Sequence, residues 1–231
     1  MIEPLAEHYR VIAPDLPGHG QSSKPFINYR IQTFTDFLNQ LYHALAVDQA
    51  VLIGHSASGA ASAKLALDYP NKVRALVLVD AGYAYAIPDV SDSRQLGHNP
   101  GTLWVLSPAT REQARQLFAL GSVQQPSDKI VDDFFAQSLT SAYAMGKVVE
   151  SFARREDVLD GVLGTLKQPT LIVWGREDKI TPAALGERMA REIINSKFVV
   201  IDESGHSPNV EQSAYFNAAV LPFLESIYKA Q

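Results

Sequence analysis

The chain has 231 residues, of which 46% are hydrophobic, enough to bury the core of one domain with an insertion. Its net charge of −5 and lack of a basic run argue against nucleic-acid binding, and the absence of cysteine excludes disulfides and a cysteine nucleophile. No apolar run approaches the ~20 residues of a membrane span, and the start, MIEPLAEHYR, is charged where a signal peptide is apolar. We therefore expect a soluble, cytoplasmic protein with no membrane partner.

Short apolar runs predict the β-strands. They are continuous rather than alternating, which is typical of strands buried on both faces of a parallel sheet. The runs are Arg10–Pro14, Ala50–Ile53, Val73–Val79, Thr170–Trp174 and Lys197–Ile201. Helical segments lie between most of them, including Thr33–Leu45 with one apolar face and Ala57–Tyr69, which Pro70 stops. We predict an α/β fold, a mostly parallel sheet with flanking helices.

The stretch from residue 83 to residue 167 breaks this alternation of strands and helices. It contains no convincing strand and is too long for a simple connection. Its periodicity predicts three helices, at Ala109–Leu120, Ser127–Leu139 and Ala142–Leu159. We therefore predict a core made of residues 1–82 and 168–231, with residues 83–167 inserted as a helical cap after the third strand.

The stretch VLIGHSASGAA, from Val51 to Ala61, places a serine among small residues between a strand and a helix. This is the setting of a nucleophile elbow, G-x-S-x-G, with Ser56 as the nucleophile. The pattern departs at Ser58, which stands where the motif has its second glycine. A catalytic serine also needs a base to take its proton. The alternative is a serine that only caps the helix.

Two further polar residues follow predicted strands. Asp178, in WGREDKITP, comes after the fourth strand, and His206, in DESGHSPNVEQ, comes after the fifth. Because ligands bind at the carboxyl ends of parallel strands, we expect both residues to lie near Ser56. The order Ser…Asp…His is that of a hydrolase triad. Each residue alone has a simpler explanation, a cap or solvated charge for the aspartate and a turn for the histidine, and the neighbouring Glu177 is an alternative acid.

These stretches, together with YRVIAPDLPGHGQS and VRALVLVDAG, resemble the α/β-hydrolase superfamily, of the esterase type with a helical cap. The resemblance implies that Ser56 is the nucleophile, that His206 is the general base and then acid, and that Asp178 orients the histidine. It also implies that the backbone N–H of Ala57 is one donor of the oxyanion hole. The family's G-x-x-D spacing favours Asp178 over its neighbour.

Aromatic residues of the cap are candidates for the lining of an apolar substrate pocket. We name Tyr83, Trp104, Phe134 and Phe135 as substrate-binding candidates, with ordinary helix core as an equally good explanation. No histidine pair has the spacing of a metal site, so we expect neither a metal nor a cofactor.

Other polar residues close to the motifs have structural explanations. We expect His19 to belong to a turn, or otherwise to the rim of a pocket, and His55 to be packed because strand neighbours point to opposite faces. Ser58 is expected to be a small packing residue. Asp80 ends its strand and is expected to be a hydrogen-bonded structural carboxylate.

The resemblance also implies a difference at the front of the chain. Relatives begin with strands that precede the helix at PLAEHY, and the loop after one of them supplies a second oxyanion donor. The strand absent here would lie between those at Arg10 and Ala50, which either pair directly or leave a gap for something else. Losing one donor typically lowers turnover by ~10²–10³. We therefore expect a weak catalyst, and exposed apolar surface that favours a homo-oligomer.

The leading hypothesis for function is a serine hydrolase that cleaves a small carboxylic ester through an acyl-enzyme. A runner-up of the same fold is hydrolysis of a carbon–carbon bond or a lactone, since one triad serves several reactions. A runner-up of another class is a non-catalytic protein that binds a ligand beneath the cap. A serine-directed probe discriminates between an enzyme and a binding protein.

Overall fold

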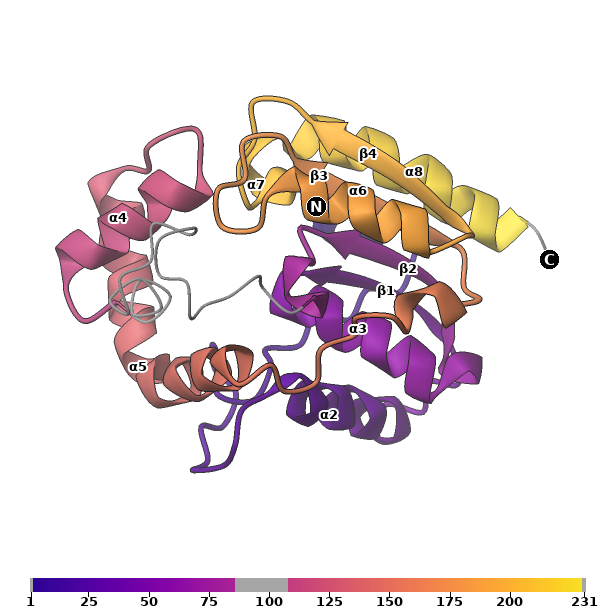
Figure 1. Ribbon diagram of the computed structural model, residues 1–231, viewed down its shortest axis with the longest axis horizontal. Helices are drawn as coiled ribbons and strands as arrows, with labels where there is room; N and C mark the ends of the chain where they lie inside the picture. Colours follow the sequence, from indigo (N-terminus) through magenta and orange to yellow (C-terminus); the bar gives the residue numbers. More distant parts are fainter. Residues whose placement is uncertain (1, 86–107, 230–231) are drawn as a thin grey trace.

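A parallel β-sheet forms the centre of the computed structural model, which describes residues 2–85 and 108–229 (Figure 1). Within these residues the sheet has the strand order β1-β2-β3-β4, and all neighbouring strands are parallel. The strands are β1 (Ala50–His55), β2 (Val73–Val79), β3 (Thr170–Gly175) and β4 (Ser196–Ile201). Four of the predicted strands and the α/β class are thereby confirmed.

Helices cover both faces of the sheet and form an insertion to one side of it (Figure 1). The α-helices are α1 (Ile2–Ala6), α2 (Ile31–Ala44), α3 (Ala57–Asp68), α4 (Arg111–Gly121), α5 (Asp128–Ala153), α6 (Ala183–Glu192), α7 (Pro208–Glu211) and α8 (Ser213–Lys229). Short 3₁₀ turns are η1 (Pro70–Lys72), η2 (Gly82–Ala84) and η4 (Leu163–Thr165). Among the described helices, none is both long and apolar enough to cross a membrane.

Two hydrophobic clusters explain why the strand sequences are continuously apolar. Along β2, Leu76 and Leu78 join a cluster with α2, α3 and α6, whereas Ala75, Val77 and Val79 join a second cluster with α1 and α8. Successive side chains of a strand point to opposite faces, so a strand covered on both sides needs an apolar residue at every position. The sheet therefore forms the middle of three layers.

The predicted strand at Arg10–Pro14 is wrong. Residues 10–14 form no strand in the structure and do not pair with β1. A strand requires a hydrogen-bonded neighbour, and the apolar side chains of Val11 and Ile12 favour extended backbone without supplying one. A cavity lies between this segment and β1 instead. One consequence is that β1, which leads to Ser56, is the edge of the described sheet.

The helical insertion is present, but it differs from the prediction in two details. It follows β2, the second strand of the described residues, and in place of the two helices predicted from Ser127 to Leu159 there is one 26-residue helix, α5, which ends at Ala153. The helix continues through residue 140, where the Thr140 hydroxyl donates a hydrogen bond to the Gln137 carbonyl of the preceding turn. The helices α4 and α5 contact each other and lie beyond the strand ends (Figure 1).

Candidate active site

The serine at the strand-to-helix junction has a strained backbone. Ser56 lies between β1 and α3 with φ 55° and ψ −124°, a conformation that costs about 1–3 kcal/mol for a residue with a side chain. The junction is crowded, because a Cβ on Gly59 would lie 2.6 Å from the Cβ of Ala81. The Ser56 side chain makes no capping hydrogen bond to α3. The helix-cap explanation therefore does not account for this serine.

Ser58, the departure from the elbow pattern, is accommodated by local hydrogen bonds. Its hydroxyl donates to the His55 carbonyl at 2.7 Å and accepts from the His55 N–H at 3.0 Å. The side chain is thus turned back toward the end of β1. The close approach between strand and helix falls at Gly59, so a small polar residue fits at position 58.

Asp178 is held by the loop that follows β3. Its Oδ1 accepts hydrogen bonds from the backbone N–H groups of Ile180 (2.8 Å) and Thr181 (3.0 Å), and its Oδ2 accepts from the Thr181 hydroxyl (2.7 Å). The buried Trp174 fixes this loop by donating its indole N–H to the Thr181 carbonyl at 2.7 Å. The carboxylate is therefore oriented before any ligand arrives.

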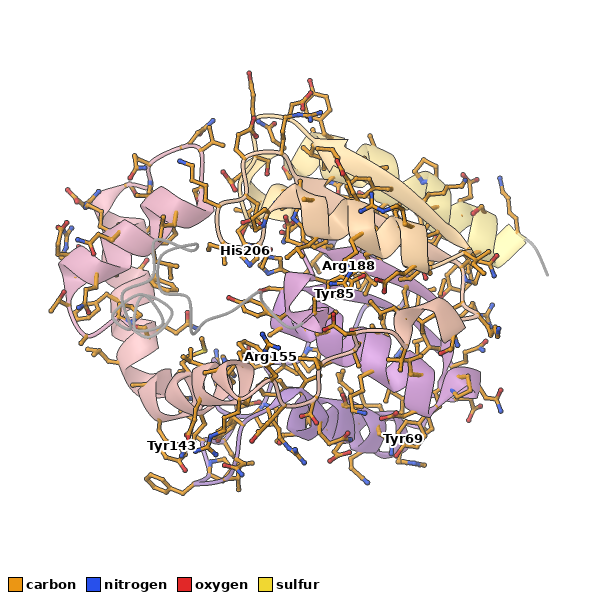
Figure 2. All side chains as sticks on the ribbon, viewed as in Figure 1. Tyr69, Tyr85, Tyr143, Arg155, Arg188 and His206 are labelled. Carbon is orange, nitrogen blue, oxygen red and sulfur yellow. The ribbon has the colours of Figure 1, made fainter. Side chains whose placement is uncertain are left out.

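His206 is held by the loop that follows β4 and by the end of α4. Its backbone N–H donates to the Gly121 carbonyl at 2.7 Å. A side chain on Gly205 would collide with the same carbonyl, so glycine is required for this close approach. Contact between the insertion and the core therefore sets the position of the histidine (Figure 2).

Ser56, His206 and Asp178 form a continuous hydrogen-bonded row. The Ser56 hydroxyl lies 2.9 Å from Nε2 of His206, and Nδ1 of His206 lies 2.7 Å from Oδ2 of Asp178. The arrangement has Nδ1–H donating to the carboxylate, which leaves Nε2 free to accept the serine proton. Glu177, the alternative acid, is exposed and accepts a hydrogen bond from the Ser204 N–H instead.

The two buried carboxyl groups near His206 are in opposite protonation states. Burial acts against ionisation of Asp178, but hydrogen bonds from His206 and Thr181 outweigh it and hold the pKa of Asp178 below its usual value. Burial and the nearby Asp178 charge raise the pKa of Asp80 to about 10. Oxygens of both carboxyl groups lie within 4.8 Å of each other, a separation at which two buried like charges repel strongly. At neutral pH, Asp178 is ionised and Asp80 is neutral.

Asp80→Asn should stabilise the protein at alkaline pH. Between the usual aspartate pKa and about 10, the native state binds a proton that the unfolded chain releases, so Asp80 lowers stability as pH rises. Asparagine keeps an oxygen to accept the Gly175 N–H, which lies 3.0 Å from Asp80 Oδ1. We expect a higher melting temperature than wild type at pH 8, and a smaller difference at pH 5.

Asp36→Asn, at an exposed position, is the matched control for this prediction. It should leave the melting temperature unchanged at both pH 8 and pH 5. Hydrolytic turnover of Asp80→Asn should stay within about twofold of wild type, because the neutral acid and the amide have the same shape. A mutant that melts lower than wild type at pH 8 would show that Asp80 is ionised in the native state.

His55 is closer to the site than expected. Its Nε2–H donates to the His206 carbonyl at 2.5 Å, and the two rings lie 4.9 Å apart. Burial, followed by the nearby His206, lowers the pKa of His55 to about 4, so His55 is neutral at physiological pH. His55 thus anchors the backbone of His206 through this hydrogen bond. The alternation of side chains along a strand does not predict such a contact with a distant loop.

The start of α3 is favourable for negative charge next to Ser56. Ala57 is the first residue of this 12-residue helix, so its N–H has no partner within the helix, and it lines the cavity that contains Ser56. The helix dipole adds a partial positive charge at the same end. An oxyanion formed beside Ser56 would meet this N–H group.

A cavity of about 370 Å³ opens above the hydrogen-bonded row. Tyr83 and Phe134 line it, Phe135 does not, and Trp104 lies outside the described residues. Its apolar walls come from both core and insertion, namely Leu16, Phe34, Leu117, Phe118, Met145, Val148, Phe152 and Ile180. Contact of these residues with a substrate stays a prediction.

Charged side chains are nearly absent from this cavity. Among the described residues that line it, there is no lysine, arginine, aspartate or glutamate. Its titratable groups among the described residues are Tyr83, His19, His55 and His206. His19 belongs to a turn and also lines the cavity, with Nδ1 3.0 Å from the Pro17 carbonyl. The walls that the described residues form are therefore almost free of charge.

Asp80, Asp178 and His206 are the cluster among the described residues that could hold a metal ion, with ligand atoms within 4.8 Å. Three of the four carboxylate oxygens already accept hydrogen bonds: the Gly175 N–H faces Asp80 Oδ1, backbone N–H groups face Asp178 Oδ1, and the Thr181 hydroxyl faces Asp178 Oδ2, whereas Asp80 Oδ2 has no partner among the described residues. N–H groups directed at a carboxylate occupy the positions that a cation would take. The cluster is better explained as a hydrogen-bonded support of His206.

Thr181 was not among the candidates from the sequence, although it contacts two of them. Its hydroxyl lies 2.7 Å from Asp178 Oδ2 and 3.3 Å from Nδ1 of His206. The available signal was the spacing Asp-x-x-Thr, which is typical of turns closed by an aspartate side chain. This pattern is too common to point to a functional site by itself.

The chain belongs to the alpha/beta hydrolase family, whose model matches residues 1–219. It is similar to 2-hydroxymuconate semialdehyde hydrolase of Pseudomonas sp. strain CF600, with 31% identity over 95% of this chain and 78% of the relative. This establishes the α/β-hydrolase fold and the family indicated by the sequence motifs.

Two solved structures illustrate the range of activities among the structural neighbours. A thermophilic esterase from Thermogutta terrifontis, with malate bound, has a TM-score of 0.80 and 27% identity over 97% of this chain and 83% of its own. A meta-cleavage product hydrolase from Pseudomonas fluorescens, complexed with acetates, has a TM-score of 0.76 and 25% identity over 97% and 83%. The structural neighbours therefore include an esterase and a meta-cleavage product hydrolase.

Proposed function

We propose that this protein is a serine hydrolase that cleaves small, uncharged carboxylic esters through an acyl-enzyme. The observation that carries the proposal is the row of hydrogen bonds from Ser56 through His206 to Asp178, at 2.9 Å and 2.7 Å. At these distances a histidine can take the serine proton as a general base, while the carboxylate holds the histidine ring in the required orientation.

Acylation begins when Ser56 Oγ attacks the ester carbonyl carbon and its proton passes to Nε2 of His206. The negative charge that forms on the carbonyl oxygen is stabilised by the N–H of Ala57 and the positive end of α3. Collapse of the intermediate breaks the ester bond, and the leaving alcohol takes the proton from Nε2.

Deacylation repeats the same proton transfers with water. Nε2 of His206 takes a proton from the attacking water, whose oxygen bonds to the acyl carbon. The carboxylic acid then leaves as Ser56 Oγ regains its proton. Asp178 keeps Nδ1 of His206 protonated throughout, so that Nε2 is the basic nitrogen at each step.

Cleavage of a carbon–carbon bond is the second candidate, because one triad serves several reactions and a relative is named as a hydrolase of 2-hydroxymuconate semialdehyde rather than of an ester. A muconate semialdehyde carries a carboxylate, which requires a cationic partner when it is buried. No lysine or arginine lines the cavity among the described residues. The uncharged walls formed by the described residues support an uncharged ester as the substrate.

The test compares p-nitrophenyl butyrate with the p-nitrophenyl monoester of succinate, which has a carboxylate at the end of a similar chain. We expect kcat/KM for the neutral ester to be higher by about 100-fold or more, because a buried carboxylate without a partner costs several kcal/mol. 2-Hydroxymuconate semialdehyde should be turned over no faster than the succinate ester. Faster cleavage of the semialdehyde would favour the carbon–carbon reaction.

Two adjacent phenylalanines give a matched control for the place where the acyl group binds. Phe134 lines the cavity and Phe135 does not, so Phe134→Ala should shift preference toward longer acyl chains and Phe135→Ala should not. We further propose that residues 83–167 act as the cap that sets this preference, and that residues 1–82 and 168–231 form the core. Equal shifts in both variants would contradict this role of the cavity.

A further inference from the structure

Glu211, the half-buried last residue of α7, binds the loop that contains His206. One oxygen of its carboxylate, Oε1, accepts hydrogen bonds from the backbone N–H groups of Gly205 at 3.0 Å and Ser207 at 3.4 Å. These two residues flank His206 in the sequence. The side chain therefore holds the backbone before and after the histidine, and the bond from Gly205 is the shorter and stronger of the two.

The other oxygen of the same carboxylate binds the helical insertion. Oε2 of Glu211 accepts the backbone N–H of Val123, just beyond the end of α4, at 2.8 Å. This bond lies where the insertion meets the core beside α7 (Figure 1). Gly121 and Ser122, which precede Val123, line the cavity of the candidate active site. One side chain thus connects the cavity wall to the histidine loop, because a carboxylate accepts several hydrogen bonds at once.

The backbone N–H of His206 completes this junction by donating to the Gly121 carbonyl at 2.7 Å. Each N–H group of residues 205–207 is therefore bound either by Glu211 or by the insertion. Hydrogen bonds to an ionised carboxylate are stronger than those to a neutral carbonyl. We conclude that the Glu211 carboxylate makes the stronger part of the link between the insertion and the histidine loop.

The ring of His206 has little tolerance for movement of its backbone. It contacts Ser56 at 2.9 Å through Nε2 and Asp178 at 2.7 Å through Nδ1, and both contacts are needed at the same time. A misplacement of about 1 Å, even one that originates away from the reacting atoms, can lower a rate by about 100-fold. Glu211 does not itself line the cavity among the described residues, so it acts on the chemistry through the His206 backbone.

We propose that Glu211 is a positioning residue that couples contact between insertion and core to the position of the general base. The inference rests on the proposed role of His206 in ester hydrolysis. With the bond between Glu211 and Val123 in place, residues 205–207 are held in the geometry of the hydrogen-bonded row. Without it, the histidine loop loses its stronger link to the insertion, and His206 occupies that geometry for less of the time.

The first test is Glu211→Gln, which preserves size but replaces one oxygen with an NH₂ group that cannot accept. Either Val123 or Gly205 then loses its partner. We expect kcat for p-nitrophenyl butyrate to fall by about 10- to 100-fold while KM changes by less than about threefold, because the cavity walls are unaltered. Glu203→Gln, at an exposed position in the same loop, is the matched control and should stay within about twofold of wild type.

Val123→Pro tests the insertion side of the link and leaves Glu211 intact. Proline has no N–H, and Ser122 already has φ −138° and ψ 145°, the conformation preferred before proline. We expect kcat to fall by at least about tenfold, whereas Val123→Ala keeps the N–H and should stay within about twofold. Val123 is 45% exposed, so neither variant removes much packing. Together with Glu211→Gln, Val123→Pro should reduce kcat by less than the product of the two separate losses, since both remove one bond.

Two readouts are independent of hydrolysis and report on His206 directly. The proton on Nδ1, hydrogen-bonded to Asp178, should give a sharp downfield NMR signal in wild type, assigned by its absence from His206→Gln. This signal should broaden by exchange with water in Glu211→Gln and Val123→Pro and stay sharp in Glu203→Gln. Hydrogen exchange at the His206 amide should become at least about tenfold faster in the same two variants.

Unchanged kcat and an unchanged Nδ1–H signal in folded Glu211→Gln would overturn the proposal. Losses that multiply fully in the double variant would show that Glu211 supports His206 independently of the insertion, which would also overturn it. If Glu211→Gln fails to fold, the comparison of Val123→Pro with Val123→Ala decides. If the wild-type protein hydrolyses no ester, the proposed function fails, and the NMR signal and the amide exchange still decide whether Glu211 positions His206.

Discussion

Ser56→Ala should reduce ester hydrolysis by roughly 10⁴–10⁶ in turnover while leaving the protein folded. The hydroxyl is small, and among the described residues its side-chain hydrogen bond is to Nε2 of His206. Its loss removes the atom that would attack the carbonyl and little packing. Turnover of the purified variant should be measured on p-nitrophenyl butyrate, with circular dichroism to establish that the fold is retained.

Ser58→Ala is the control for this experiment, because Ser58 is the neighbouring hydroxyl in the same cavity. Its hydrogen bonds run to the backbone of His55, so we expect a small loss of stability and a turnover within about tenfold of wild type. If Ser56→Ala kept wild-type turnover and Ser58→Ala lost it, Ser58 would be the nucleophile.

Asp178→Asn should lower turnover by roughly 10³–10⁴, because an amide cannot hold Nδ1 of His206 in its protonated form. The same change should affect stability in a pH-dependent way. The native pKa of Asp178 lies below its usual value, so its charge stabilises the fold above the usual aspartate pKa. This contribution is lost as pH falls through the native pKa. The variant should therefore melt below wild type at pH 7, with a difference that narrows in acid.

Glu177→Gln is the matched control, since this carboxylate is adjacent in sequence but exposed. Glutamine still offers an oxygen to the Ser204 N–H, 3.0 Å from Glu177 Oε2, and turnover should stay within about twofold of wild type. A larger loss of activity in Glu177→Gln than in Asp178→Asn would assign the acid to Glu177.

The parts of the fold that the sequence predicts correctly are those whose residue pattern within one segment is sufficient to identify the element. The strands β1 to β4 are continuous apolar runs, and this pattern has a single physical cause, burial on both faces of a sheet. The convergence of Ser56, Asp178 and His206 was predictable for a related reason, since all three follow the carboxyl ends of parallel strands.

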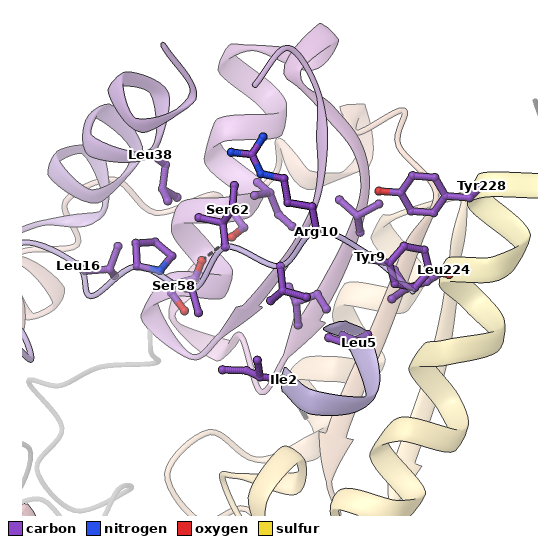
Figure 3. Close-up of a pocket in the computed structure, with 17 residues that line it drawn as sticks. Ile2, Leu5, Tyr9, Arg10, Leu16, Leu38, Ser58, Ser62, Leu224 and Tyr228 are labelled. Atoms are coloured by element: carbon purple, nitrogen blue, oxygen red, sulfur yellow. Dashed lines mark hydrogen bonds between the residues drawn. The ribbon is translucent and has the colours of Figure 1, made fainter. Parts of the chain in front are cut away.

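The structure of residues 10–14 was not predictable from the sequence. The preference of a residue for extended backbone is a local property, whereas a strand also needs a hydrogen-bonded neighbour from elsewhere in the chain. Val11 and Ile12 favour a strand, yet β1 lies across a cavity from them (Figure 3). The helix α5 was missed for the opposite reason. Thr140 and Ser141 fall between the two predicted helices, but their hydroxyls are compatible with helix when they bond or pack locally.

Several features of the candidate site depend on contacts between distant segments. Asp80, which follows β2, contacts Gly175 of β3 and Thr181 beyond it, and His55 contacts the loop after β4. Phe134 and Phe135 are identical in type and adjacent, and the path of α5 alone decides which of them lines the cavity. Spacing within one segment contains no information about such contacts.

The most direct measurement of the central claim is covalent labelling of the protein with a fluorophosphonate, followed by mass spectrometry of its tryptic peptides. The phosphonyl group forms a stable bond only with a serine whose proton is removed by a neighbouring base. We predict one label per chain, on Ser56, that is absent from Ser56→Ala and strongly slowed in Asp178→Asn. An unlabelled Ser56 in folded protein, or a label on another serine, would contradict the account.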